Sequence, residues 1–379
     1  MKPIIKPISK ELLKSELRPE FFLRETNRAG NEIYIVTAAQ APNVMQEIGR
    51  LREWAFRSAG GGTGESVDID ELDLVEGGYK QLVVWDPAAE EIVGGYRFIV
   101  CEDENESHLS TEHYFRFSER FRKEYLPHVI ELGRSYVHPN YQNTRANAKS
   151  LYVMDNIWDG LGAIIVNHPT KKYFVGKVTM YTHYNTEARN ILMYFLHKYF
   201  TPTEGLLDPV YPIDLGIDTA AMEALFTAGN YNDDHKILTR ELKERGEFIP
   251  PMISSYMNVS PSMQVFDTVT NPDFGDVEET AIMVTIPDMY PHKVDRHTNG
   301  ISKGAAPFHK LLDKTMMAID NVVVGLAVPA VKVALRRRRP ERDARQERNS
   351  ATTGKAVKTT SKATKSKVVK SKTAKSKKE

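Results

Sequence analysis

The sequence predicts an α/β fold of the α+β kind, with a mixed, mostly antiparallel sheet flanked by helices. Between residues 31 and 200, short apolar runs rich in β-branched residues alternate with segments of helical periodicity. Two of these runs, 81–86 and 92–100, are separated only by a polar turn that contains proline. Such a short turn joins antiparallel strands, whereas parallel strands need a long crossover. The pattern therefore favours a mixed sheet over a doubly wound parallel one.

The other expected elements follow from the same two periodicities. Between residues 201 and 290 the pattern is weaker, and only strands are expected there. The remaining expected strands are 32–37, 128–137, 172–181, 262–268 and 280–286, and the expected helices are 42–57, 148–166, 186–200 and 308–335.

The composition is that of a globular protein with a core, since 41% of the 379 residues are hydrophobic and 27% are charged. Cys101 is the only cysteine, which excludes an internal disulfide framework and fits a reducing compartment. The N-terminus has no apolar run typical of a signal peptide, and no uninterrupted apolar stretch reaches the roughly 18 residues of a spanning helix. We therefore expect a cytoplasmic protein.

Charge is distributed unevenly along the chain. Residues 336–379 contain 17 Lys/Arg and 4 Asp/Glu, whereas residues 1–335 contain 34 and 46. The basic tail has almost no large apolar residue and is expected to be disordered. We expect four segments: an N-terminal extension (1–30), the folded domain (31–290), an amphipathic to apolar helical segment (291–335) and the tail (336–379).

An acidic loop precedes the predicted hairpin, with Asp68, Asp70 and Asp73 in the run VDIDELD. One interpretation is a solvated loop. The other is a set of carboxylates that attracts the ammonium group of an amino-acid substrate.

Charged residues also stand inside predicted strands. Arg97 lies in an apolar strand, where burial requires an ionic partner, and a structural ion pair is the simpler alternative. Glu131 and Arg134 lie in the strand VIELGRSYV, where strict alternation would put them on opposite faces. A β-bulge near Gly133 would return both to one face. A structural salt bridge is again the alternative.

Two further features are weaker candidates. Arg50 and Trp54 lie on one predicted helix, where core packing competes with substrate binding. The run Gly60–Gly64 lacks the lysine and the preceding strand of a phosphate loop, so a lid or linker is favoured. The histidines form neither an HExxH motif nor a Cys/His array, so no metal site is predicted.

The order of these clusters resembles the shared core of acyl-homoserine-lactone synthases and ornithine-lipid N-acyltransferases, which belong to the GNAT superfamily. The resemblance lies in VDIDELD, IVGGYRFIV and VIELGRSYV, and covers roughly residues 30–210. The segments VMDNIWDGLGAIIV and YFVGKVTMY are most similar to the hemolysin-like branch, which makes N-acyl ornithine or N-acyl glycine.

This resemblance implies a GNAT-like fold and transfer of a long-chain acyl group, with or without a 3-hydroxyl, from acyl carrier protein to the α-amino group of glycine or ornithine. It implies Glu131, Arg134 and Arg97 as catalytic residues. Asp68, Asp70 and Asp73 match the acidic substrate-binding loop, while Arg50 and Trp54 match only loosely. The glycine-rich pyrophosphate signature expected after Val137 is absent, which favours a carrier-protein thioester over acetyl-CoA as co-substrate. No bound cofactor is implied.

Such chemistry needs a base, because an ammonium group is not nucleophilic, and Glu131 is the predicted base. Its product is an amphiphile, so the apolar helix and the four arginines at 336–339 suggest a peripheral anchor on an anionic membrane. A packing helix with a solvated tail is an alternative, and nucleic-acid binding is less favoured. The rival functions are another GNAT reaction, such as autoinducer synthesis or acetyl-CoA-dependent acetylation, and a non-catalytic membrane- or nucleic-acid-binding protein.

Overall fold

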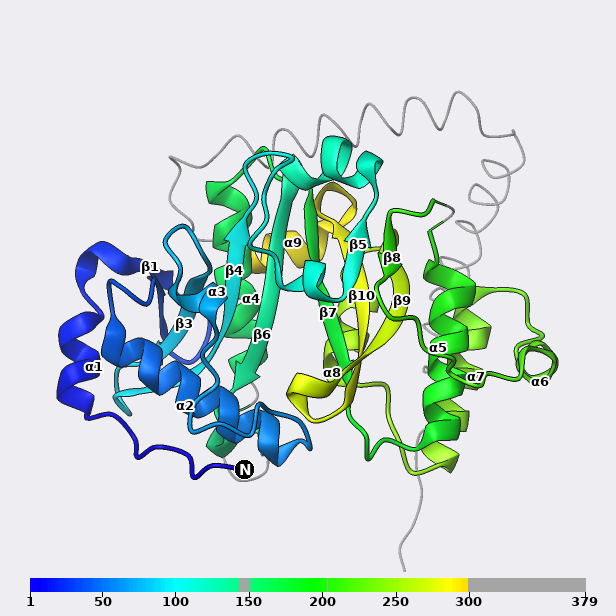
Figure 1. Ribbon diagram of the computed structural model, residues 1–379, viewed down its shortest axis with the longest axis horizontal. Coiled ribbons are helices and arrows are strands. Elements are labelled where there is room, and N and C mark those ends of the chain that lie inside the picture. The colour runs from blue at the N-terminus through cyan, green and yellow to red at the C-terminus, as the bar shows by residue number, and fades with distance from the viewer. Residues whose placement is uncertain (143–149, 151, 203, 299–379) are drawn as a thin grey trace, which may run out of the picture. The chain divides into compact units, whose positions relative to one another are not determined.

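The computed structural model describes residues 1–142, 150, 152–202 and 204–298, and its main feature there is a sheet with the strand order β1-β2-β3-β4-β6-β7-β10-β9 (Figure 1). Its neighbouring strands pair antiparallel, except that β6 and β7 are parallel. The strands are β1 (Phe22–Glu25), β2 (Glu32–Val36), β3 (Lys80–Asp86), β4 (Glu91–Val100), β6 (Val129–Val137), β7 (Tyr173–Met180), β9 (Gln264–Asn271) and β10 (Val277–Thr285). The predicted mixed, mostly antiparallel sheet is confirmed.

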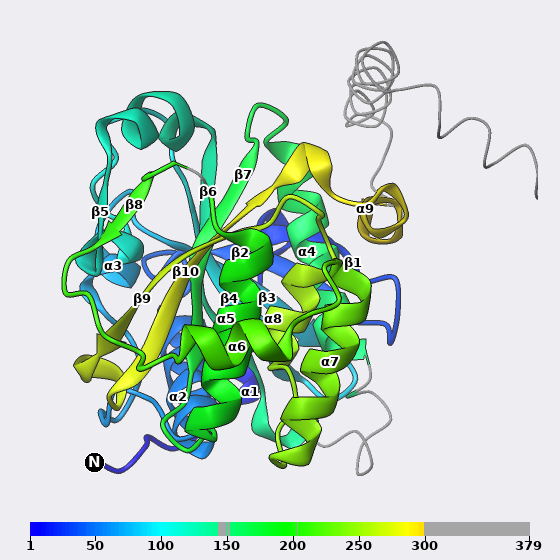
Figure 2. The ribbon, with the colours of Figure 1, turned by 90° about the vertical axis from the view of Figure 1, so that its right-hand side faces the viewer.

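Helices cover both faces of this sheet (Figures 1 and 2). Residues of α2 form one buried cluster with strands β2 and β3, whereas α4, α5, α7 and α8 form the larger cluster on the other face. The helices are α1 (Lys10–Glu16), α2 (Pro42–Ser58), α3 (Glu71–Leu74), α4 (Val153–Asn167), α5 (Thr186–Phe200), α6 (Thr219–Leu225), α7 (Tyr231–Glu244), α8 (Pro251–Met257) and α9 (Pro291–Thr298). A second, small sheet pairs β5 (Phe115–Phe117) with β8 (Leu207–Pro209).

The predicted hairpin is formed by β3 and β4. The Asp86 carboxylate accepts hydrogen bonds from the backbone N–H groups of Ala88 and Ala89, and Glu90 takes a positive φ of 54°. Local bonding of this kind is typical of Asp at turns and closes the connection in four residues. The strand register then pairs Gln81 with Arg97, which places the arginine in the middle of the sheet.

The structure differs from the expectation most between residues 201 and 290. Among the described residues there, three helices (α6, α7 and α8) and the short strand β8 stand in addition to the two expected strands. Helix α7 did have a local signal, because Asn230 caps it and Asp233 and Asp234 occupy its first turn. Residues 22–25 of the expected N-terminal extension form the edge strand β1. The helix expected at 308–335 and the basic tail lie outside the described residues.

Strands β6 and β7 separate after a short paired stretch. Their pairing ends at Leu132 and Gly176, although both strands continue for several residues. At the same level, Arg134 and Ser135 together oppose the single residue Tyr96 of β4, and Arg134 has a φ of +48°. This is a β-bulge, which bends a strand and interrupts its pairing. The bulge predicted near Gly133 is therefore present, with Arg134 as the residue of positive φ.

Candidate active site

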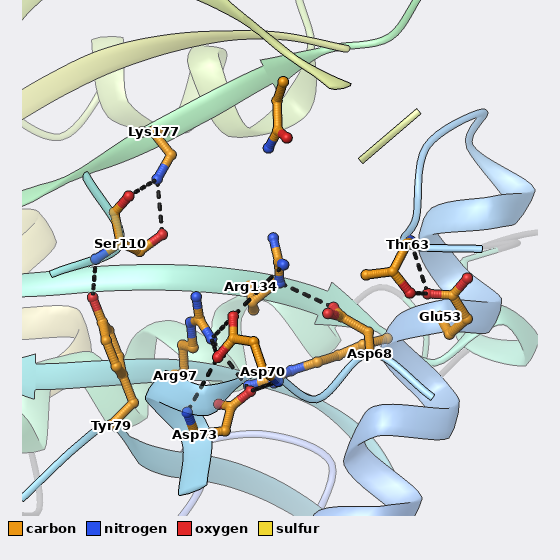
Figure 3. Close-up of polar contacts among 12 residues, drawn as sticks. Glu53, Thr63, Asp68, Asp70, Asp73, Tyr79, Arg97, Ser110, Arg134 and Lys177 are labelled. Atoms are coloured by element: carbon orange, nitrogen blue, oxygen red, sulfur yellow. Dashed lines mark hydrogen bonds and ion pairs between the residues drawn. The ribbon is translucent and has the colours of Figure 1, made fainter. Parts of the chain in front are cut away.

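Arg97 is the centre of a buried ionic cluster between β4 and the loop that leads into α3. Its Nη1 donates to both carboxylate oxygens of Asp70, at 2.8 and 2.7 Å, and to Asp73 Oδ2 at 3.2 Å (Figure 3). The guanidinium also lies 4.6 Å from the ring centroid of Tyr79. Asp73 receives a second cation, Arg52, at 3.1 Å. Arg97 thus braces the acidic loop against the sheet.

The acidic loop owes its shape to local capping. Asp70 is the N-cap of α3, and its side chain accepts a hydrogen bond from the backbone N–H of Asp73, whose own side chain accepts from the N–H of Asp70. This reciprocal capping box explains the spacing of the two aspartates. Burial by itself would raise the pKa of Asp73, but Arg52 and Arg97 hold that pKa well below its usual range.

The predicted substrate carboxylates divide into two kinds. Asp68 and Asp73 are buried, and each serves as an internal counter-ion. Asp70 is the partly exposed member, with 32% of its side chain accessible, and it lines a polar cavity. Only Asp70 of the three predicted aspartates therefore stands where it could contact an amino-acid substrate.

The Arg134 side chain extends from the bulge in β6 toward the acidic loop. Its Nε lies 3.0 Å from Asp68 Oδ2 and its guanidinium 4.5 Å from the ring centroid of Phe274. Its Nη2 also lies 3.8 Å from Asp70 Oδ2, so Arg97 and Arg134 meet at one carboxylate. Desolvation raises the pKa of Asp68, although the nearby Arg134, Arg52 and Arg97 oppose the shift.

Glu131 shares this face of the sheet but points into a closed polar network. Its carboxylate accepts hydrogen bonds from the Tyr79 hydroxyl and from both the N–H and the hydroxyl of Thr111. The residue is 2% exposed and is not among the residues that line the two cavities described below. Its catalytic role therefore stays a prediction, and its visible role is to hold the segment that contains Ser110 and Thr111.

Arg50 and Trp54 belong to a different neighbourhood. Arg50 forms an ion pair with Glu47 on the same helix, and its guanidinium lies 5.6 Å from the Trp54 ring. Trp54 packs edge-on against His138. Neither residue lines the two cavities, so the structure does not bring them together with Arg97, and their predicted substrate role has no geometric support.

Two cavities, each of about 210 Å³, meet beside the arginine cluster. The first passes between the separating strands β6 and β7 and continues along apolar side chains such as Leu132, Met252 and Ile253. The second is polar and opens between the acidic loop, the Ser110 segment and residues 271–274. Six residues line both cavities: Arg97, Ser110, Arg134, Lys177, Phe274 and Glu279.

The glycine-rich run forms part of the wall of the polar cavity. Glu53, which is fully buried, accepts hydrogen bonds from the N–H and hydroxyl of Thr63 and from the N–H of Gly64. Thr63 lines the cavity, and Gly61 lies so close to the side chains of Tyr181 and Phe274 that a Cβ there would clash. The loop is anchored rather than free, and its glycines permit close packing over the site.

Comparison with known proteins places this architecture in a family. Residues 51–151 match the acetyltransferase (GNAT) domain family. The glycine N(alpha)-acyltransferase of Phocaeicola vulgatus is 49% identical over 308 residues, which cover 80% of this chain and 94% of that protein. The glycine N(alpha)-acyltransferase of Bacteroides thetaiotaomicron is 51% identical over 302 residues, which cover 78% and 90%. The chain belongs to this N-acyltransferase family.

The predicted resemblance to the aminolipid branch of GNAT enzymes is thereby confirmed. A solved CoA-dependent acyl-homoserine lactone synthase also matches this N-acyltransferase, over 72% of the chain and 90% of that structure. The TM-score of 0.32 and the identity of 12% are too low for that match to support an argument about the site. Among the residues that the structure describes, no three or more His, Cys, Asp or Glu side chains are grouped to hold a metal ion, and no helix is long and apolar enough to cross a membrane.

Lys177 and Glu279 line both cavities of the N-acyltransferase, and neither was predicted from the sequence. Lys177 lies in the strand segment YFVGKVTM, where a lone lysine among mostly apolar residues was the available signal. Its ammonium donates to the carbonyl and the hydroxyl oxygen of Ser110, at 3.0 and 2.9 Å (Figure 3). Burial lowers the pKa of Lys177, an effect that the nearby Glu279 and Glu131 oppose. No local pattern marked Glu279 as a site residue, because it lies among other polar residues at the start of β10.

Proposed function

We propose that the protein transfers a long-chain fatty acyl group from acyl carrier protein to the α-amino group of glycine. The observation that carries this proposal is the meeting of a polar and an apolar cavity at six shared residues. An amino acid and a fatty acyl thioester need environments of these two kinds, and their reacting atoms must meet. The curated relatives at about 50% identity act on glycine, which favours glycine over ornithine as the acceptor.

The polar cavity suits a small zwitterion. Asp70 offers a partly exposed carboxylate for the ammonium group, and the Arg134 guanidinium lies near enough to bind the carboxylate of the amino acid. Arg97 pairs through Nη1 with both Asp70 and Asp73, so we assign it the role of holding the acidic loop in place. Thr63 and the anchored glycine-rich loop limit the size of the acceptor from above.

The gap between β6 and β7 suits a pantetheine thioester. After Leu132, the edge of β6 that faces β7 no longer pairs with it, so its backbone groups can bond the amides of an extended pantetheine arm. The fatty chain would then enter the apolar cavity beside Met252, Ile253 and Tyr256. N–H groups at the bulge are expected to stabilise the tetrahedral oxyanion. No glycine-rich pyrophosphate signature follows Val137, which supports a carrier-protein donor.

Donor choice tests this function directly. Purified full-length protein would receive a long-chain acyl carrier protein or acetyl-CoA, each with glycine and with ornithine, and N-acyl products would be measured by mass spectrometry. We expect efficient formation of N-acyl glycine from the acyl carrier protein alone. Efficient turnover of acetyl-CoA, with none of the long-chain carrier protein, would overturn the proposed donor, and preferred acylation of ornithine would overturn the proposed acceptor.

We also propose that the C-terminal region holds the protein at an anionic membrane, where its amphiphilic product would partition. This region lies outside the described residues, so the proposal rests on its sequence. Deleting residues 336–379 should weaken binding to anionic vesicles, because each basic residue near such a surface contributes roughly 1 kcal/mol. Deleting 308–379 should also weaken binding to neutral vesicles. Vesicle flotation at low and high salt measures both, and equal flotation of all three proteins would refute an anchor.

A further inference from the structure

Glu279 presents an unsatisfied carboxylate oxygen at the junction of the two cavities. The residue is 4% exposed, lines both cavities, and its Oε2 accepts no hydrogen bond from the residues that the structure describes. The Lys177 ammonium lies 3.7 Å from that oxygen, beyond hydrogen-bond distance. A buried oxygen without a donor is unfavourable. An ammonium group that entered the polar cavity could supply the missing donor.

Strand register explains why Glu279 faces the site. On the paired strands β7 and β10, Glu279 is opposite Thr179 and Ala281 is opposite Lys177. Paired residues and residues two apart share one face of a sheet, so Glu279 and Lys177 point the same way. Lys177 in turn donates to Ser110, whose neighbour Thr111 bonds Glu131. The glutamate at the cavity and the glutamate in the closed network are thus linked through Lys177 and the Ser110 segment.

The carboxylates of Glu131 and Glu279 differ in whether they can still accept a proton from a substrate. The Glu131 carboxylate already accepts three hydrogen bonds from Tyr79 and Thr111, and it lines neither cavity. A general base must come within hydrogen-bond distance of the proton that it removes. Glu279 lines both cavities, at the place where an amine and a thioester would meet, whereas an amine could reach Glu131 only if the network around it opened.

We propose that Glu279 is the general base that deprotonates the amino group of the acceptor, and that Glu131 is a positioning residue that acts through the Ser110 segment and Lys177. The proposal rests on the proposed function. The ammonium nitrogen gives one proton to Glu279, which releases it to solvent. The freed electron pair attacks the thioester carbon and forms the C–N bond of the tetrahedral oxyanion. The oxyanion then collapses, the C–S bond breaks, and a second nitrogen proton ends on the departing sulfur. The amide product keeps one N–H.

The pH dependence of Glu279→Gln tests this role. With a saturating acyl donor, the variant should lose about 10²–10⁴-fold in kcat for glycine near neutral pH. Its residual rate should rise about tenfold per pH unit toward the pKa of the free amine, because only the neutral amine then reacts. The wild-type rate should level off at lower pH. Glu279→Asp should recover part of the rate, and unfolding and donor-binding measurements would verify that the variants fold.

Glu278→Gln is the matched control. Glu278 neighbours Glu279 on the same strand but forms an ion pair with Arg189 at 2.6 Å and lines neither cavity, so the wild-type rate and pH profile are expected. A folded Glu279→Gln protein with a near-wild-type rate overturns the proposal. So does a slow variant with the wild-type pH profile, or the alkaline rise appearing in Glu131→Gln instead. If the wild type prefers another amine, the proposed acceptor fails, and the same comparison is made with that amine.

Discussion

Arg97→Met is expected to lower the free energy of unfolding by about 3–5 kcal/mol, because it breaks a buried ionic cluster and removes the cation that Asp70 and Asp73 share. The guanidinium is 1% exposed, and its two partners Asp70 and Asp73 hold the acidic loop against β4. Methionine replaces the aliphatic part of the side chain, so the loss comes mainly from the missing guanidinium. Activity should fall as well, since the loop forms one wall of the polar cavity.

Urea unfolding followed by circular dichroism measures this change. Arg120→Met is the matched control, because Arg120 is also paired with two carboxylates, Glu124 and Glu204, but is 49% exposed, and no measurable shift in the midpoint is expected. Arg97→Lys should recover part of the loss through its charge. An Arg97→Met protein as stable as the control would show that Arg52 alone neutralises the cluster.

Arg134→Met is expected to cost about 3 kcal/mol of stability near neutral pH, because it removes the nearest cation from the buried Asp68 carboxylate. Arginine and methionine are equally strained at the positive φ of this position, so the backbone does not contribute to the difference. The phenyl ring of Phe274 also loses its cationic neighbour, which is a smaller effect.

The pH dependence of that variant has a definite sign. Burial already raises the pKa of Asp68, and loss of Arg134 removes a cation that opposed the shift. A carboxyl group whose pKa is higher in the folded than in the unfolded state destabilises the fold as pH rises through the folded value. Arg134→Met should therefore become more stable, relative to the wild type, on acidification from neutral pH toward the unfolded pKa of about 3.9.

Adding Asp68→Asn to Arg134→Met should restore most of the lost stability and remove the pH dependence, since a neutral amide needs no counter-ion. Denaturation of the wild type, the two single variants and the double variant at two pH values forms a complete cycle. If the second substitution restores nothing, the ion pair between Arg134 and Asp68 is not the source of the effect.

Local sequence signals were sufficient to predict several of the secondary-structure elements around the site. The hairpin β3–β4 followed from its turn, and the expected helix at 186–200 coincides with α5. The bulge in β6 followed from a glycine between two charged residues of one strand. Asp70 and Asp73 form a capping box, which needs only two residues three positions apart in the sequence. These features depend on short stretches of chain, so they can be recognised without the fold.

The division of labour among the charged residues depended on the tertiary structure. Glu131 and Glu279 are both glutamates in strands. They differ in their hydrogen bonds, because Tyr79 and Thr111 donate to Glu131, whereas Oε2 of Glu279 has no donor among the described residues. Lys177 and Glu279 are about 100 residues apart and meet because β7 pairs with β10. Register between distant strands is set by the packing of whole sheet faces rather than by the residues themselves. The order of short motifs along the sequence was therefore enough to predict N-acyltransferase chemistry. Only the fold showed that the Glu279 carboxylate, rather than that of Glu131, faces the cavities.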